Sequence, residues 1–247
     1  MVARTIARPF ERFFERISGG GILLMFVTLA ALLWANSPMQ DYYNLVWDHD
    51  LFFGLSGYAL HHSVLHWIND GLMVIFFFVV GLEIKREFIA GELSSFRQAI
   101  FPILAAVGGM LVPIALFTVF GLSGEASKGW GIPMATDIAF SLAVLGLLGS
   151  RVPLSLKVFL TALAIVDDLG AILVIALFYS HQIYWSYLLI AFGLLLVLVL
   201  ANYFDVQIIH LYTGIGFLIW FLFLKSGIHP TIAGVLIAFT IPARPKV

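Results

Sequence analysis

Long runs of apolar residues, separated by short polar connections, are the dominant pattern of this 247-residue chain. A helix needs about 20 mostly apolar residues to cross the hydrocarbon core of a bilayer. Runs that approach this length cover residues 20–35, 66–82, 100–120, 130–148, 154–179, 184–203, 208–224 and 229–241. The last run is short for a complete span, so we expect it to be tilted, half-buried or incomplete. The pattern predicts an all-α polytopic membrane protein, a helical bundle that forms a single transmembrane domain over residues 1–247.

Composition supports this interpretation and excludes several classes of protein. The chain is 62% hydrophobic and only 11% charged, whereas soluble domains carry about 25% charged residues. A transmembrane β-barrel would need short alternating segments, but the apolar runs here are continuous. The net charge of −1 is uninformative about nucleic acid, but the lack of a basic patch argues against it as a partner. Because the sequence contains no cysteine, disulfides, thiolate metal sites and cysteine nucleophiles are excluded.

The distribution of lysine and arginine predicts the orientation of the spans. With the amino terminus in the cytoplasm, only Lys128 and Lys225 fall outside, and the other 11 of the 13 basic residues fall inside. Residues 1–17 then form a cytoplasmic amphipathic segment, with arginine at every fourth position from 4 to 16. No clear cleavage site follows the first run, so we expect it to remain as a span.

The longest connection, residues 36–65, is extracytoplasmic in this topology and is rich in aromatic residues and glycine. Its composition suits a small hairpin at the membrane surface or a contact with another subunit, and an ordinary interfacial loop is the simpler interpretation. His61, His62 and His66 suggest a metal site only weakly, because they lack the HExxH spacing.

The fourth run carries signals of an interrupted helix. Gly131 and Pro133 weaken a regular helix, and Thr136 and Asp137 are residue types that favour helix N-caps. We therefore expect a short helix, an extended break and a second short helix. Such breaks occur at membrane depth only where they line a cavity or are buried in protein. A span kinked by proline, with one hydrogen-bonded aspartate, is the alternative.

Two adjacent carboxylates, Asp167 and Asp168, lie in the middle of the fifth run, whose only other charge is Lys157 near its beginning. A charge at the centre of a membrane helix costs about 2.5–3.5 kcal/mol on insertion scales. Neighbouring helical residues point about 100° apart, so one carboxylate can face a cavity while the other turns toward a neighbouring helix. A structural pair neutralised by a lysine or arginine elsewhere is the alternative interpretation.

The chemistry of such a pair suits the exchange of a cation for protons. Two close carboxylates titrate as a coupled system, and we expect at least one proton to be held at neutral pH when no cation is bound. A small hard cation such as sodium or lithium prefers oxygen ligands, so it competes with protons for the same oxygens. Competition combined with alternating exposure to the two sides of the membrane produces antiport.

Several stretches, in order along nearly the entire chain, resemble the NhaA-type sodium/proton antiporters. They are residues 67–70 (WIND), 80–87 (VGLEIKRE), 135–140 (ATDIAF), 148–153 (LGSRVP), 164–171 (AIVDDLGA) and 225–234 (KSGIHPTIAG). The resemblance implies an inverted-repeat transporter fold, with sodium or lithium and protons as the transported ions, no resident cofactor and no enzymatic activity. The implied role is pH and sodium homeostasis.

The resemblance also implies roles for individual residues. Asp167 and Asp168 match the family's paired ion-binding aspartates, and so would be the ligands of the transported Na+. Thr136 matches a residue near the ion, and Asp137 matches one that balances helix-end dipoles at the crossing of the interrupted helices. Residues matching those linked to the pH response are Glu83, Arg86, Glu87 and His229. The 36–65 loop matches a surface hairpin used in dimer contact, which implies a homodimer.

The chain departs from the family pattern in length. Members have about twelve spans and two interrupted helices, whereas eight runs are found here. A truncated, non-transporting fragment or one half of a split protein is therefore an alternative to a complete antiporter. An intramembrane protease is a more distant alternative, because Ser56 and Ser123 each lie in a GxSG tetrapeptide. That pattern is weak in a glycine-rich chain and does not explain the buried aspartates.

Overall fold

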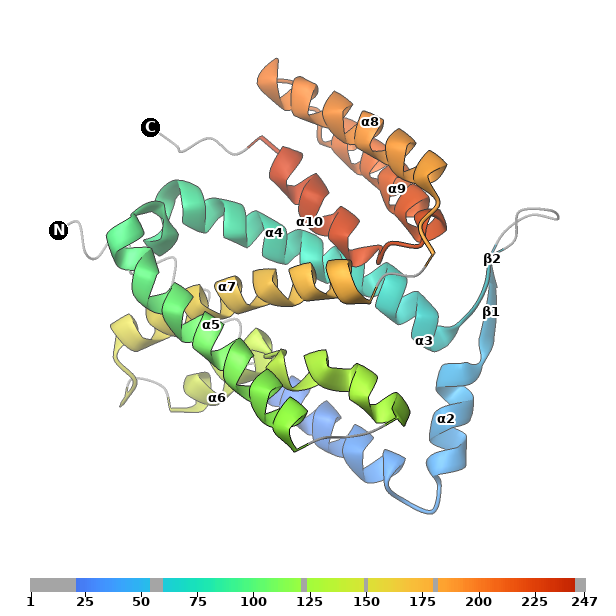
Figure 1. Cartoon of the computed structure of the whole chain (residues 1–247), viewed down its shortest axis with the longest axis vertical. Coiled ribbons are helices and arrows are strands. Elements are labelled where there is room, and N and C mark those ends of the chain that lie inside the picture. Colours follow the sequence, from blue (N-terminus) through green and yellow to red (C-terminus); the bar gives the residue numbers. More distant parts are fainter. Residues whose placement is uncertain (1–20, 54–59, 121–123, 149–150, 180–181, 243–247) are drawn as a thin grey trace.

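The chain folds into a set of membrane-spanning helices with one short hairpin (Figure 1). The computed structural model describes residues 21–53, 60–120, 124–148, 151–179 and 182–242. Five helices in these ranges are long and apolar enough to cross a membrane: Val64–Ile89, Ala99–Val119, Ser155–Phe178, Trp185–Tyr203 and Ile209–Ser226. The chain is therefore an all-α, multi-pass membrane protein, as the apolar runs predict. The predicted amphipathic segment 1–17 lies outside the described residues, as do Ser56 and Ser123.

The first run forms the helix Gly21–Ala35, which is followed by α2 (Gln40–Asp48) at an angle of 111°. Two four-residue strands, β1 (Asp50–Phe53) and β2 (Leu60–Ser63), then pair antiparallel with Asp50 opposite Ser63. The strand pairing of a hairpin, one of the interpretations left open for residues 36–65, is thus present, and its position at a membrane surface stays a prediction. The tip of the hairpin lies outside the described residues, and the strands lead directly into the second span (Figure 1).

The second span contains a wide turn near its N-terminal end. It begins with α3 (Val64–Trp67), capped by the Ser63 hydroxyl, which accepts from the backbone N–H of His66 at 3.3 Å. A π-helical turn, η1 (Ile68–Leu72), follows, and α4 (Met73–Ala90) completes the span. π-turns inside α-helices are rare and are frequently found at functional sites.

The middle of the chain contains the elements that hold the polar residues of the membrane interior. The 3-10 turn η2 (Glu92–Ser94) leads into α5 (Phe96–Val119). The fourth run consists of the 3-10 segment η3 (Gly124–Met134), kinked at Gly129, and the short helix α6 (Ile138–Leu147). The long helix α7 (Leu154–Phe178) begins after Pro153, which suits a helix start because its fixed φ is close to the helical value. The predicted interruption of the fourth run is therefore confirmed.

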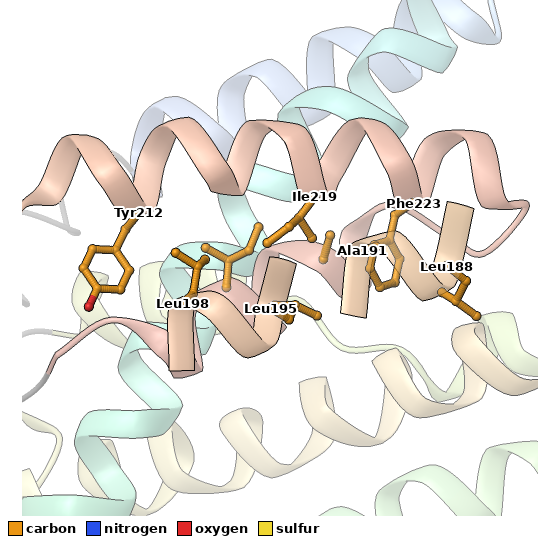
Figure 2. Close-up of a cluster of buried hydrophobic side chains, with 9 residues drawn as sticks. Leu188, Ala191, Leu195, Leu198, Tyr212, Ile219 and Phe223 are labelled. Atoms are coloured by element: carbon orange, nitrogen blue, oxygen red, sulfur yellow. The ribbon is translucent and has the colours of Figure 1, made fainter. Parts of the chain in front are cut away.

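The last three helices pack through an apolar core (Figure 2). They are α8 (Trp185–Tyr203), α9 (Ile209–Ser226) and α10 (Thr231–Thr240). Leucines and an alanine along one face of α8 meet Ile219 and Phe223 of α9, both of which are at most 1% exposed. The tight turn between α9 and α10 requires Gly227, whose φ is +83°. As expected for the shortest run, α10 has only 10 residues, about 15 Å of rise.

Helix α4 joins this group to the rest of the molecule. It packs closely along α10, because Gly81 faces Ala238 and Gly234 faces the backbone of α4. On its other side Val80 and Ile84 join a buried cluster with residues of η2, α5 and α7. In this way α4 lies between the α8–α10 group and α7, the helix that carries both aspartates.

Candidate ion-binding site

The two aspartates lie in the middle of α7 and are among the most buried polar residues of the protein. Asp167 is 2% exposed and Asp168 is 7% exposed. Asp167 lies 13 residues beyond the first residue of α7, about 20 Å along its axis. The helix continues through both residues without a break, so the aspartates are held on a regular backbone. The depth and burial expected from the apolar run are both present.

The interrupted fourth run meets Asp167 at its break. Residues 135–137 separate η3 from α6 and are not helical. Within this break the Thr136 hydroxyl donates a hydrogen bond to Asp167 Oδ2. A break at this depth leaves backbone groups that no helix satisfies, and these can turn toward a ligand. The structure thus brings together Thr136 and Asp167, which are 31 positions apart.

Asp137 begins the second half of the interrupted run. Its carboxylate accepts a hydrogen bond from the backbone N–H of Phe140 at 3.1 Å, so it is the N-cap of α6. An acidic side chain at this position interacts favourably with the positive end of the helix dipole. The N-cap predicted from the sequence is therefore found at Asp137, while Thr136 is used by the aspartate pair.

The electrostatic surroundings of Asp168 are acidic. Among the described residues, the charged groups that act on it are Asp167, Asp137 and Glu83, all of them carboxylates. Its Oδ2 atom is buried and has no hydrogen-bond partner among the described residues. An unsatisfied buried carboxylate oxygen costs about 1–3 kcal/mol or more, so this oxygen is a natural acceptor for a proton or a cation. The alternative of a pair neutralised by a basic residue receives no support from this environment.

The acidic side chains alone do not complete a coordination shell. No group of three or more acidic or histidine side chains in the described ranges is arranged to hold a metal ion. A small hard cation at the pair would therefore need further oxygens, from the Thr136 hydroxyl, backbone carbonyls or water. The same finding gives no support to a metal site at His62 and His66, whose rings stack with centroids 4.0 Å apart.

The residues matched to a pH response divide between the two ends of the second span. Glu83, Arg86 and Glu87 lie near the C-terminal end of α4, where Arg86 Nη2 is 3.4 Å from Glu87 Oε1. Glu87 is only 5% exposed, so this helix end is not the fully solvated terminus that its composition indicates. His229 lies at the other end, with Nδ1 3.7 Å from Asp70 Oδ1. Asp70 and Glu83 are 13 positions apart, about 20 Å along the helix.

Two residues without a predicted role, Asp70 and Lys85, prove to be structurally important. Asp70 is 9% exposed and has His66 Nε2 at 3.0 Å from its Oδ2 atom. Lys85 donates hydrogen bonds to the carbonyls of Phe239 at 2.7 Å and Ile241 at 2.6 Å. The i,i+4 spacing of His66 and Asp70 is a local signal that could have been noticed. The contacts of Lys85 join segments more than 150 positions apart, and the sequence contains no local signal for them.

Tyr179, at the end of α7, binds the backbone of η3, the first part of the interrupted run. The hydroxyl of Tyr179 donates to the carbonyl of Lys128 at 2.8 Å and accepts from the N–H of Gly131 at 3.1 Å. Trp130 packs edge-on against Phe178, with ring centroids 5.1 Å apart. The part of η3 around Lys128 and Gly131 is therefore fixed to the end of α7, and the Thr136 hydrogen bond fixes the break to the middle of α7.

Comparison with known proteins identifies the family. The sequence profile of the Na+/H+ antiporter 1 family matches residues 11–247. Among curated relatives, the Na(+)/H(+) antiporter NhaA of Oleidesulfovibrio alaskensis is 56% identical over 236 residues, covering 96% of this chain and 52% of the relative. The Na(+)/H(+) antiporter NhaA 2 of Syntrophotalea carbinolica is 54% identical, covering 98% of this chain and 55% of the relative.

The chain thus spans about half the length of these relatives. The match nevertheless includes the aspartate pair, the interrupted run, and Glu83, Arg86 and Glu87 of α4. On the strength of a profile match over residues 11–247, this chain belongs to the Na+/H+ antiporter 1 family.

Proposed function

We propose that the protein exchanges sodium or lithium ions for protons across the bacterial cytoplasmic membrane, and so contributes to pH and sodium homeostasis. One observation carries the proposal: two adjacent carboxylates are buried in the middle of an apolar helix, where Asp167 accepts from the hydroxyl of the interrupted run and the charged groups described around Asp168 are all acidic. Such a site gains stability by binding either a proton or a cation, and the two exclude each other.

Each residue of the site has its own proposed role. Asp167 and Asp168 supply the oxygens for which Na+ and H+ compete, and the Thr136 hydroxyl stabilises the ionised form of Asp167 through its hydrogen bond. Asp137 keeps the end of α6 in place and adds negative charge near Asp168. The cation is a substrate, and no resident cofactor or enzymatic step is needed.

The proposed orientation places the amino terminus in the cytoplasm. If successive spans cross the membrane in alternating directions, the contacts between separate spans join ends that lie on the same side. Lys85 meets the end of α10 on the proposed inner side, while Tyr179 meets Lys128 and Asp70 meets His229 on the proposed outer side. These pairings support the order of the spans, and the lysine and arginine distribution supports the absolute direction.

Two further assignments belong to the same proposal. The hairpin region 36–65 is the contact surface of a homodimer, an idea supported by its exposed position at one end of the molecule (Figure 1). The polar groups at the inner end of α4, namely Glu83, Arg86 and Glu87, and His229 at the outer end adjust activity to pH.

The proposal is tested in everted membrane vesicles that contain the 247-residue chain. Respiration acidifies the vesicle interior, and addition of Na+ or Li+ should dissipate the pH gradient. Asp167→Asn and Asp168→Asn should each abolish this response. Asp205→Asn is the matched control, because Asp205 is exposed at the α8–α9 turn with φ +61°, a conformation that asparagine adopts readily.

A binding measurement distinguishes competition between Na+ and protons at the site from transport across the membrane. Calorimetry on the purified chain should detect Na+ binding that weakens as the pH falls, because protons compete for the pair. Binding that does not depend on pH would contradict the competition mechanism. Competitive binding without any dissipation of the gradient would instead favour the alternative of a non-transporting fragment or split-protein half.

A further inference from the structure

The short helix α2 is held between the ends of two consecutive apolar runs. The chain leaves the helix Gly21–Ala35 and enters α2 through a bend of 111°. At the other end of α2, the carbonyl of His49 accepts from the N–H of Val64, where the second span begins, at 2.9 Å. Figure 1 shows α2 at the edge of the molecule, between the first helix and the hairpin. Because two consecutive spans are connected on one side of a bilayer, both ends of α2 are fixed at the same boundary between lipid and water.

Three stripes of different chemistry run along α2, since residues three or four positions apart share one face of a helix. The polar stripe consists of Gln40, Asp41, Asn44 and Asp48. A partly buried aromatic stripe consists of Tyr43 and Trp47. The apolar stripe, which starts at the residue before the helix, consists of Met39, Tyr42, Leu45 and Val46, each between 41% and 66% exposed. A helix with separate polar and exposed apolar faces is typical of a position in the membrane interface.

A row of aromatic rings fixes the rotation of α2 about its axis. Tyr43 packs edge-on against Trp34 of the first helix, with ring centroids 5.5 Å apart, and against Trp47, with centroids 5.6 Å apart. Because these contacts hold the aromatic stripe beside the first helix, the apolar stripe is presented outward. Tryptophan and tyrosine are also enriched where membranes meet water, so the row suits the boundary at which α2 is held.

The length of α2 excludes a position across the membrane. Its 9 residues have a rise of about 14 Å, roughly half the thickness of the hydrocarbon core. A path through hydrocarbon would also place the whole polar stripe, with Asp41 and Asp48, in lipid, where a charged side chain is costly. With α2 lying along the surface, the same carboxylates stay in water and the apolar stripe can reach the acyl chains.

The charge of α2 defines the kind of lipid contact. The helix has two aspartates and no lysine or arginine, so attraction to anionic headgroups does not drive its binding and burial of apolar surface does. We propose that α2 is an interfacial helix, anchored by its apolar stripe in the leaflet on the hairpin side of the membrane. The strands β1 and β2 stay free for the proposed dimer contact. The inference rests on the membrane spans and not on ion exchange.

Site-directed spin labelling tests the position of α2. Because the sequence contains no cysteine, Val46→Cys or the matched control Asn44→Cys supplies the only labelling site. The two residues are both exposed and lie on opposite stripes. Each labelled chain is reconstituted into vesicles of phosphatidylcholine, with and without added phosphatidylglycerol. Power saturation then measures how accessible the label is to oxygen, which concentrates in lipid, and to a water-soluble nickel chelate.

We expect the label at position 46 to be accessible mainly to oxygen, at a depth of about 5–10 Å in the boundary between headgroups and acyl chains. The label at position 44 should be accessible mainly to the nickel chelate. Both results should be the same in the two kinds of vesicle, because the contact is apolar. Tyr42→Cys supplies a second position on the apolar stripe and should behave like Val46→Cys, so the test does not depend on one variant.

Several results would overturn the proposal. Equal accessibility at positions 44 and 46 would show that α2 does not lie with one face in lipid. Low accessibility to both reagents at position 46 would show that protein covers the stripe, and spectral broadening that disappears on dilution with unlabelled chain would identify that protein as a second copy. A greater depth in the anionic vesicles would contradict an apolar anchor. Because the measurement uses no ion gradient, its failure is distinct from a failure of sodium exchange.

Discussion

The hydrogen bond between Thr136 and Asp167 gives the sharpest prediction about the site. Thr136→Val keeps the shape of the side chain and removes the only hydroxyl that donates to the pair among the described residues. A hydrogen bond to a charged group contributes about 1.5–3 kcal/mol. Because Thr136 is itself exposed, we take the lower end of that range. The expected loss of about 1.5 kcal/mol corresponds to slightly more than tenfold weaker apparent sodium binding.

The pH dependence of this effect separates two roles of the hydroxyl. If the hydroxyl only favours the ionised carboxylate over the protonated one, the difference between variant and wild type should shrink as the pH rises and protons cease to compete. If the hydroxyl is a direct ligand of the cation, the difference should persist at alkaline pH.

Calorimetric titration with Na+ across a pH series measures the effect, and sodium-dependent thermal stabilisation provides a second readout. Thr161→Val is the control. Thr161 is buried on the same helix as the aspartate pair, but its hydroxyl donates to the carbonyl of Lys157, away from the pair. Unchanged affinity at every pH in Thr136→Val, with binding abolished in Asp167→Asn, would refute the assigned role of the hydroxyl.

Three further substitutions test the packing by thermal unfolding in detergent. Gly234→Ala should destabilise the protein by about 1–3 kcal/mol, because its new methyl group meets the backbone of α4, whereas Gly108→Ala, with open space around it, should not. Tyr179→Phe should cost about 1–3 kcal/mol, because it leaves two backbone groups of η3 without their partner, and Tyr203→Phe, at an 82% exposed residue, is its control. Phe223→Ala should cost about 3–5 kcal/mol by opening a cavity in the α8–α10 core. A midpoint unchanged from wild type in any of the three would contradict the packing described.

The features that the sequence predicts well are those with a local signal. The apolar runs predict the spans, since hydrocarbon thickness sets a minimum length for each. Gly131, Pro133 and Asp137 predict the interruption of the fourth span, because backbone chemistry at these residues disfavours one continuous helix. The depth of Asp167 follows from counting residues along α7.

The features that the sequence does not predict depend on contacts between distant segments. The ties of Lys85 to the end of α10 and of Trp220 to Asp70 join residues at least 150 positions apart. The strand pairing in residues 36–65 depends on register across a loop, which aromatic composition does not specify. Likewise, the residues matched to a pH response form one group by resemblance, but they are not close together in the fold. Glu83, Arg86 and Glu87 lie near one end of the second span, and His229 lies beside its other end.

The π-turn at Ile68–Leu72 has a consequence for how sequences of this family should be aligned. A π-turn holds one residue more than an α-turn, and here the widened ring presents the carbonyl of Asp70 to the indole of Trp220. Deleting a single residue from this turn would restore ordinary helix geometry and withdraw that carbonyl, although every apolar position would still look suitable for a span. A relative with a one-residue deletion in this turn therefore has a different local backbone structure. We expect such a relative also to carry a different residue at the position of Trp220.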